Sequence, residues 1–240
     1  MSPIVPIIEL AASSGLGSLL GMRHALEPDH LAAVSTLVTD GPGAHGTHRR
    51  AKAAFLGMCW GLGHTFALIA IGAVLVVLRA EMPTGASDFF ELCVALMLIG
   101  LGLRAMYHAA GQGTSGPVHM HHHGGVVHRH PGTPKHIHIG TWTLARRPLL
   151  VGAVHGLAGS GALTALVLTT LPTTAARLSY MVLFGLGSTL GMAAMSGLLG
   201  WPLARVSGNR TLSRSVSFAV GCVSTALGLF WGYPLVGRMF

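Results

Sequence analysis

The chain has 240 residues, of which 51% are hydrophobic and 9% are charged. This composition excludes an ordinary water-soluble domain and indicates an integral membrane protein, whose 34 glycines let helices pack closely. The formal net charge of +8 does not indicate a nucleic-acid partner, because Lys and Arg lie in short segments between apolar runs. The three cysteines form no Cys-x-x-Cys pair, so neither a disulfide framework nor thiol redox chemistry is indicated.

Six apolar stretches are each long enough to cross about 30 Å of hydrocarbon. We therefore predict an all-α integral membrane protein with a single transmembrane domain over residues 1–240. The first stretch is too long for a simple span and contains a charged cluster, so we interpret it as a broken helix. The predicted spans lie near residues 8–38, 51–78, 88–108, 148–171, 178–200 and 213–236.

The distribution of Lys and Arg predicts the orientation of the chain. Most of these residues lie in the connections after the first, third and fifth spans, whereas the second and fourth connections and the C-terminal tail hold one Arg each. By the positive-inside bias, the odd-numbered connections lie in the cytoplasm and both termini lie outside. We expect a multi-pass protein of the cytoplasmic (inner) membrane.

A weak internal repeat relates the two halves of the chain. Residues 60–65 (WGLGHT) resemble residues 184–189 (FGLGST), and residues 24–26 (HAL) resemble residues 155–157 (HGL). Because each half holds an odd number of spans, the second half must be inverted relative to the first. The sequence thus predicts two inverted three-helix repeats, a transporter plan that places the binding site near the membrane midplane.

Residues 111–140 form a low-complexity connection rich in His, Gly, Pro and Thr. We predict a disordered cytoplasmic loop, since nothing in it can build a core. Neutral imidazoles at high local concentration hold Ni²⁺, Co²⁺, Zn²⁺ or Cu²⁺ loosely, and the alternative is a tolerated insertion with no role. The candidate loop ligands are His119, His121, His122, His123, His128, His130, His136 and His138.

The first predicted span carries an unusual cluster of ionisable residues. An ionisable group at mid-membrane costs about 2.5–3.5 kcal/mol on insertion scales, so such a cluster persists only if it pairs internally, faces a polar cavity or binds a ligand. Our default interpretation is a buried cation site. The cluster consists of Arg23, His24, Glu27, Asp29 and His30.

Pro28 interrupts this cluster and alters its geometry. Proline lacks an N–H group, so the carbonyl of His24 loses its helical partner and the helix must kink or unwind. Unwinding brings His24, Asp29 and His30 toward one point, with the freed carbonyl as a further ligand. Imidazole suits Ni, Co, Cu and Zn, and the carboxylate adds a hard oxygen. The alternative is a structural polar network in which Arg23 pairs with an acidic residue of the cluster.

His64 in the second predicted span is the natural partner from a neighbouring helix, because glycines beside it allow close approach. Spans 4–6 contain no Asp or Glu, so ligands from the second half must be His155, a hydroxyl group or a backbone carbonyl. For His155, a hydrogen bond across a helix interface is an equally good interpretation. The hydroxyl candidates are Ser160, Thr164, Ser188 and Thr189.

These motifs resemble those of the nickel/cobalt transporter (NiCoT) family. The segment from His24 to His30 matches the family's H-x4-D-H motif, and residues 62–65 (LGHT) resemble its L-G-H-S/T segment. Residues 154–161 and 183–188 resemble the shorter six-span relatives described as urease-accessory nickel permeases. The resemblance implies that the metal is handled by His24, Asp29, His30 and His64. The chain departs from the larger family members, which have eight spans and acidic later motifs.

The function that follows is a secondary transporter (permease) that takes up Ni²⁺, with Co²⁺ as a second cargo. No nucleotide-binding motif is present, and we expect neither enzymatic activity nor a prosthetic group. The expected partners are a divalent transition-metal ion and the lipid bilayer, and the resemblance adds cytoplasmic nickel chaperones or urease accessory proteins.

Three alternatives differ in their sequence requirements. Efflux of Ni, Co or Zn fits the same residues and differs only in direction. A membrane di-iron oxidase or hydroxylase needs several His-rich motifs at fixed spacing, which the chain lacks. A thiol electron carrier needs cysteines at the start of spans 1 and 4, and neither span contains one.

Overall fold

The computed structural model describes residues 15–39, 47–111, 118–123, 126–131, 137–139, 142–144, 146–206 and 209–239. A helix over residues 15–24 is followed by a turn over residues 25–27 and then by α2 (Pro28–Thr39). The predicted break in the first span is therefore confirmed, and it lies where Pro28 begins the new helix. Proline is favoured at this first helical position because its missing N–H group has no partner there in any case.

Five long helices follow, and each is long and apolar enough to cross a membrane. They match the last five predicted spans, with ends that differ by a few residues. The first predicted span has no single helix of that length, and its residues 8–14 lie outside the described residues. The long helices are α3 (Thr47–Leu78), α4 (Thr84–Ala109), α5 (Arg146–Thr170), α6 (Thr174–Val206) and α7 (Arg210–Met239).

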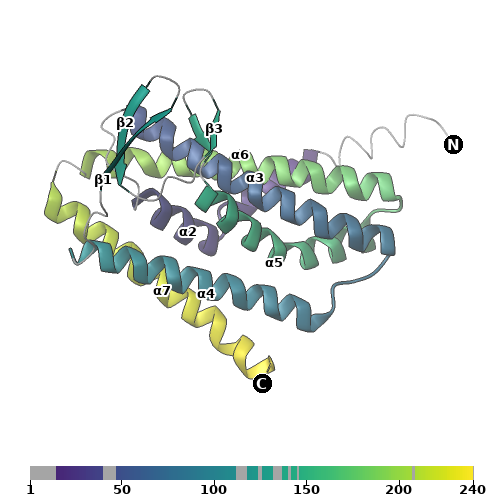
Figure 1. The fold of residues 1–240 in the computed structure, drawn as a ribbon. Coiled ribbons are helices and arrows are strands. Elements are labelled where there is room, and N and C mark those ends of the chain that lie inside the picture. Colours follow the sequence, from purple (N-terminus) through teal and green to yellow (C-terminus); the bar gives the residue numbers. More distant parts are fainter. Residues whose placement is uncertain are drawn as a thin grey trace.

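The long helices form two packed groups. α3 packs against both α5 and α6, whereas α4 packs against α7, which crosses it along one side of the bundle (Figure 1). The short helix α2 lies between the groups and contacts α4, α6 and α7. Helix α2 is thus enclosed by the longer helices, whereas the helix over residues 15–24 lies at the edge of the bundle and exposes Leu16 and Leu19.

Glycines set the distance between α5 and α3. A Cβ atom added at Gly152 would meet the backbone carbonyl of Trp60, and one added at Gly156 would meet the carbonyl of His64. Because the obstacle is backbone in both cases, a larger side chain could be accommodated only by moving the helices apart. Small residues at such contacts allow membrane helices to approach closely. They bring His155, between these glycines, beside α3.

The outer surface of the bundle is apolar. Large hydrophobic side chains are exposed along every long helix, including Phe66 on α3 at 76% and Phe230 on α7 at 74%. In a water-soluble protein a surface of this kind would cause aggregation, whereas lipid tails solvate it. The interior holds a core around Trp60, Leu98 and Met192 and a second one around Leu68 and Met181.

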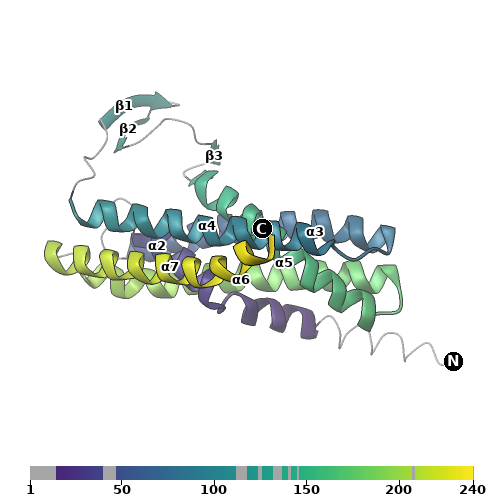
Figure 2. The same ribbon diagram turned by 90° about the horizontal axis from the view of Figure 1, so that it is seen from below.

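The segment over residues 111–140 differs from the predicted disordered loop. The backbone forms one antiparallel hairpin from β1 (Val118–His123) and β2 (Val126–Pro131), and a second from β3 (Ile137–Ile139) and β4 (Trp142–Leu144). Figure 2 shows these strands outside the helical bundle. Valine, isoleucine and threonine within the strands favour extended backbone, although a two-stranded hairpin is only marginally stable alone.

Candidate metal centre

The turn at residues 25–27 holds His24 at the end of one helix and Asp29 at the start of the next. The carbonyl of His24 accepts a hydrogen bond from the N–H group of Glu27 at 3.0 Å. The prediction that Pro28 frees this carbonyl for a ligand is therefore wrong, because a tighter three-residue turn supplies a new donor. The candidate ligand atoms at this turn are therefore those of the side chains.

Asp29 joins α2 to α5 through two histidines. Its Oδ1 atom accepts a hydrogen bond from Nδ1 of His30 at 3.0 Å, and its Oδ2 atom accepts one from Nε2 of His155 at 2.6 Å. A carboxylate that holds one ring nitrogen as N–H leaves the other nitrogen as a lone pair, which is how metal-binding histidines are commonly oriented. Those other atoms, Nε2 of His30 and Nδ1 of His155, are buried and have no hydrogen-bond partner.

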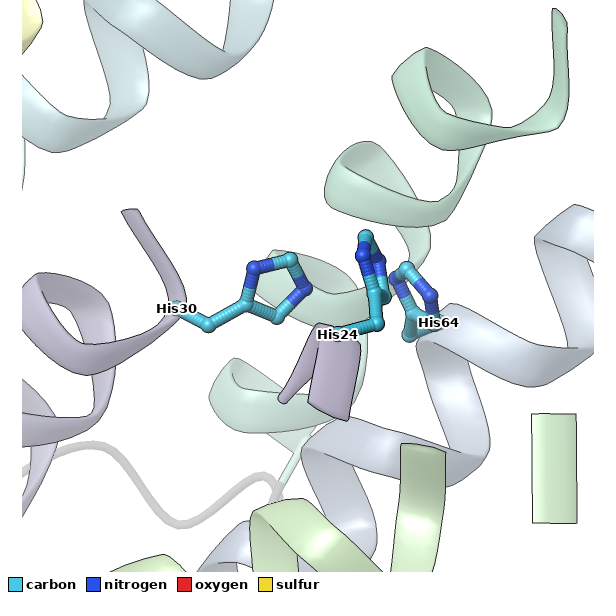
Figure 3. Close-up of side chains that lie close together, drawn as sticks. All are labelled: His24, His30 and His64. Carbon is cyan, nitrogen blue, oxygen red and sulfur yellow. The ribbon is translucent and has the colours of Figure 1, made fainter. Parts of the chain in front are cut away.

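Three histidines from three segments meet at the centre of the bundle. The side chains of His24, His30 and His64 each offer a ring nitrogen, and these atoms lie within 4.8 Å of one another. The ring centroids are 4.4 Å apart for His24 and His30, and 5.3 Å apart for His24 and His64. Figure 3 shows the ring of His30 reaching from α2 toward the other two. The arrangement has the ligand type and spacing of a transition-metal site.

His64 is the most isolated of these side chains. It is fully buried, and neither Nδ1 nor Nε2 has a hydrogen-bond partner. A buried polar group without a partner is destabilising by about 1–3 kcal/mol. A bound cation would satisfy one of the two nitrogens.

A second group of ligand atoms overlaps the first. Asp29, His30 and His155 offer atoms within 4.8 Å of one another, and all three side chains are buried. The ring centroids of His30 and His155 are 4.1 Å apart. His155, which the sequence left between a structural and a ligand role, makes the predicted cross-helix hydrogen bond and belongs to this group. His30 is common to both groups.

The charges around the site differ from the proposed Arg23 network. Glu27 forms its ion pair with His24, at 3.0 Å between Oε1 and Nδ1, and Asp29 pairs with histidines. Arg23 is exposed. Among the described residues, Asp29 is the one carboxylate that is buried. The centre therefore holds imidazoles around a single negative charge.

The hydroxyl candidates are buried but take different partners. Ser160 donates to the carbonyl of Leu157 at 2.6 Å, and Thr164 donates to that of Ser160 at 2.7 Å, so both hydroxyls turn toward their own helix. The hydroxyls of Thr189 and Thr65 lie 2.9 Å apart.

Ser188 is the exception, since its Oγ atom is buried without a partner. Of the loop histidines, His136 lies outside the described residues, and for the others only the backbone is described.

A cavity of about 920 Å³ opens beside the centre. It is lined by His24, Asp29, His30 and His155, but not by His64. Glu27 and Glu91 also face it, from the turn and from α4. Glu91 was not among the predicted site residues. Its position within an apolar stretch, in a chain with only seven Asp and Glu residues, could have indicated that it faces a polar cavity.

The chain is similar to the urease accessory protein UreH of Bacillus sp. (strain TB-90), with 28% identity over 228 residues that cover 95% of this chain and 93% of that protein. This similarity supports the resemblance to the nickel/cobalt transporter family that the motifs indicate. The five long apolar helices indicate a multi-pass membrane protein. No family model matches the sequence, and no solved structure matches it.

Proposed function

We propose that this protein is a secondary transporter that carries Ni²⁺ across the cytoplasmic membrane into the cell, with Co²⁺ as a second cargo. The observation that carries the proposal is the group of four histidines around the carboxylate of Asp29, of which His24 is partly buried and the other three are buried. Neutral imidazole favours Ni²⁺ and Co²⁺ over the hard cations Mg²⁺ and Ca²⁺, which prefer oxygen ligands. In this proposal His24, Asp29, His30 and His64 bind the ion.

Unpartnered nitrogens support a ligand role over a purely structural one. In a closed polar network every buried ring nitrogen would have a hydrogen-bond partner. Here unpartnered nitrogens occur on His24, His30, His64 and His155, which face one another at the same place. Four such histidines around one carboxylate are better explained by a site that binds a cation than by a purely structural role.

Reciprocal contacts support the inverted repeat. A Cβ atom added at Gly21 would meet the carbonyl of Phe184, and one added at Gly152 would meet the carbonyl of Trp60. When the two halves are aligned, Gly21 matches Gly152 and Trp60 matches Phe184, so the two contacts are the same contact with the halves exchanged. A two-fold axis produces this kind of reciprocity.

Two further pairs follow the same rule. Gly63 faces the carbonyl of Leu149, and its counterpart Gly187 faces the carbonyl of Ser18. In the third and sixth predicted spans, Gly102 faces the carbonyl of Gly221, and Gly228 faces that of Ala95. These contacts support six spans in two inverted repeats, with the broken first segment as the counterpart of α5.

The alignment also accounts for the single charge at the centre. His155 is the counterpart of His24, whereas Ser160 aligns with Asp29 and Ser188 aligns with His64. The second repeat thus keeps one imidazole and replaces the remaining ligands with hydroxyls and a glycine. Ion binding in this proposal is concentrated in the first repeat, and His155 is the contribution of the second.

The distribution of Lys and Arg supports an orientation with both termini outside and residues 111–140 in the cytoplasm. In this orientation the loop histidines receive the ion after passage and pass it to nickel chaperones or urease accessory proteins. The name of the relative from Bacillus, an accessory protein of urease, supports such partners.

Metal accumulation in cells tests the function and its direction together. Cells without their own nickel uptake system would express the full chain or the His30→Ala variant in medium with trace nickel, and their nickel content would be measured by mass spectrometry. Uptake predicts more nickel in cells with the unaltered chain than in cells with the variant. Less nickel than in the variant would instead identify efflux, and equal amounts would contradict transport.

A further inference from the structure

Resting on the proposed function, we propose that the centre contains two overlapping three-ligand positions that share His30, and that the ion passes from one to the other during transport. The outer position consists of Asp29, His30 and His155. The inner position consists of His24, His30 and His64. Each set of ligand atoms lies within 4.8 Å, a spacing that a small inward shift around an ion can close.

The outer position faces the cavity and carries the negative charge. Its three side chains all line the cavity, together with the carboxylates of Glu27 and Glu91. Arg238 of α7 also lines it, so three carboxylates stand against one guanidinium and the lining is negative overall. A negatively charged cleft raises the local concentration of cations. His24 of the inner position also lines the cavity, so His64 is the one ligand of the two positions that lies away from it.

The inner position lies deeper and is formed by imidazoles alone. His64 does not line the cavity, and its exposed fraction is 0%. Without a carboxylate among its ligands, this position holds a divalent ion less firmly than the outer one. Passage through a membrane requires sites that bind well enough for entry and weakly enough for release.

Geometry separates the two positions. Ligands on one ion lie about 2.0–2.1 Å from it when they are imidazole nitrogens, so all of them must surround a single point. The rings of His64 and His155 are 6.1 Å apart between centroids, and they belong to different groups. The ring of His30 is closer to each of them, at 4.1 Å from His155 and 5.5 Å from His64. His30 is thus placed to remain bound while the other ligands exchange.

Binding and transport respond differently if the two positions act in series. The full chain, purified in detergent, would be dialysed against Ni²⁺ and its bound metal counted, with His30→Ala as the reference for nickel held by the loop. We expect the unaltered chain to hold one ion above this reference, because two ions cannot share His30. His64→Ala should keep that ion in the outer position with nearly unchanged affinity. His155→Ala should keep it in the inner position with affinity reduced by about 10–100-fold, whereas the double variant should lose it.

Flux into vesicles completes the test. The nickel flux of each single variant should fall at least about tenfold, since the ion then has one position left and no second position to move to. His108→Ala, an exposed histidine at the end of α4, is the matched control and should leave both readouts unchanged. His64→Gln and His155→Gln carry the same expectation if an alanine variant does not fold.

Three results would overturn the proposal in distinguishable ways. If either single variant loses the ion as completely as His30→Ala does, the residues form one site. If both variants keep the ion and full flux, the positions do not act in series. If the unaltered chain holds no more nickel than His30→Ala and shows no flux, the proposed function itself fails, and this inference fails with it.

Discussion

Replacement of Asp29 by asparagine removes the charge of the centre while keeping the shape of the side chain. The amide retains one acceptor oxygen, but its NH₂ group would face a ring N–H of His155 or His30, which now donate to the carboxylate at 2.6 and 3.0 Å. A hydrogen bond to a charged group contributes about 1.5–3 kcal/mol. The attraction between a unit charge and a divalent ion about 4 Å away adds roughly 8 kcal/mol before desolvation, at an effective dielectric constant of 20.

We expect Asp29→Asn to weaken Ni²⁺ binding by at least about tenfold, which corresponds to about 1.4 kcal/mol. Most of the Coulomb attraction is offset by desolvation of the ion, so the hydrogen-bond contribution sets this lower limit. Both groups of ligands are affected, because His30 belongs to each and is oriented by Asp29.

Calorimetric titration of Ni²⁺ into the purified full chain measures the effect. The control is His121→Ala, which removes one loop histidine and should change the affinity of the buried centre by less than about threefold. Near-parental affinity of Asp29→Asn for the tightest ion would refute the reasoning, and the cluster would then be a structural polar network.

Four further outcomes can be measured. Reporter fusions at Phe240 and near Gly124 should report opposite compartments, and the same compartment for both would contradict the orientation. Deletion of residues 117–138 should leave nickel flux measurable, because a loop without fixed spacing tunes delivery, whereas complete loss in a variant that inserts would show an essential loop site. Gly152→Ala should lower the free energy of unfolding by about 1–3 kcal/mol, because its Cβ atom would meet backbone. Gly100→Ala should not lower it, because no atom lies within 4 Å of the Cβ atom added there. Nickel affinity should fall as the pH is lowered, since protons compete for neutral imidazole, and an affinity that stays unchanged from pH 7.5 down to about 4 would contradict imidazole ligands.

Local chemistry in the sequence was sufficient to predict the broken helix and the first candidate ligands. A proline within a helical run kinks or ends the helix, and charged residues beside Pro28 cannot face lipid. These two facts predicted the break, the gathering of His24, Asp29 and His30, and the role of His64 as their neighbour. The last five spans followed from the length of apolar runs alone.

The position of His155 could not be predicted from local sequence. Its hydrogen bond to Asp29 depends on how closely α5 approaches α3, and this distance is set by contacts of Gly152 and Gly156 with backbone carbonyls far away in the sequence. Sequence similarity to His24 indicated that it mattered, but not which atom it would meet.

Two other differences have local causes that the sequence patterns did not resolve. The carbonyl of His24 regained a partner through a three-residue turn, because Glu27 still has an N–H group within reach. The His-rich segment contains short strands with valine and isoleucine, which favour extended backbone, although its composition predicted disorder.

Nickel flux into proteoliposomes tests the central claim most directly. Vesicles with the purified full chain, and matched vesicles with His30→Ala, would receive radiolabelled Ni²⁺, with Co²⁺, Zn²⁺ and Mg²⁺ as competitors in separate samples. We predict saturable nickel entry into the vesicles that contain the unaltered chain. Co²⁺ should inhibit this entry, whereas Mg²⁺ should not. Equal nickel entry in the two kinds of vesicle would contradict a transport pathway through the buried histidines.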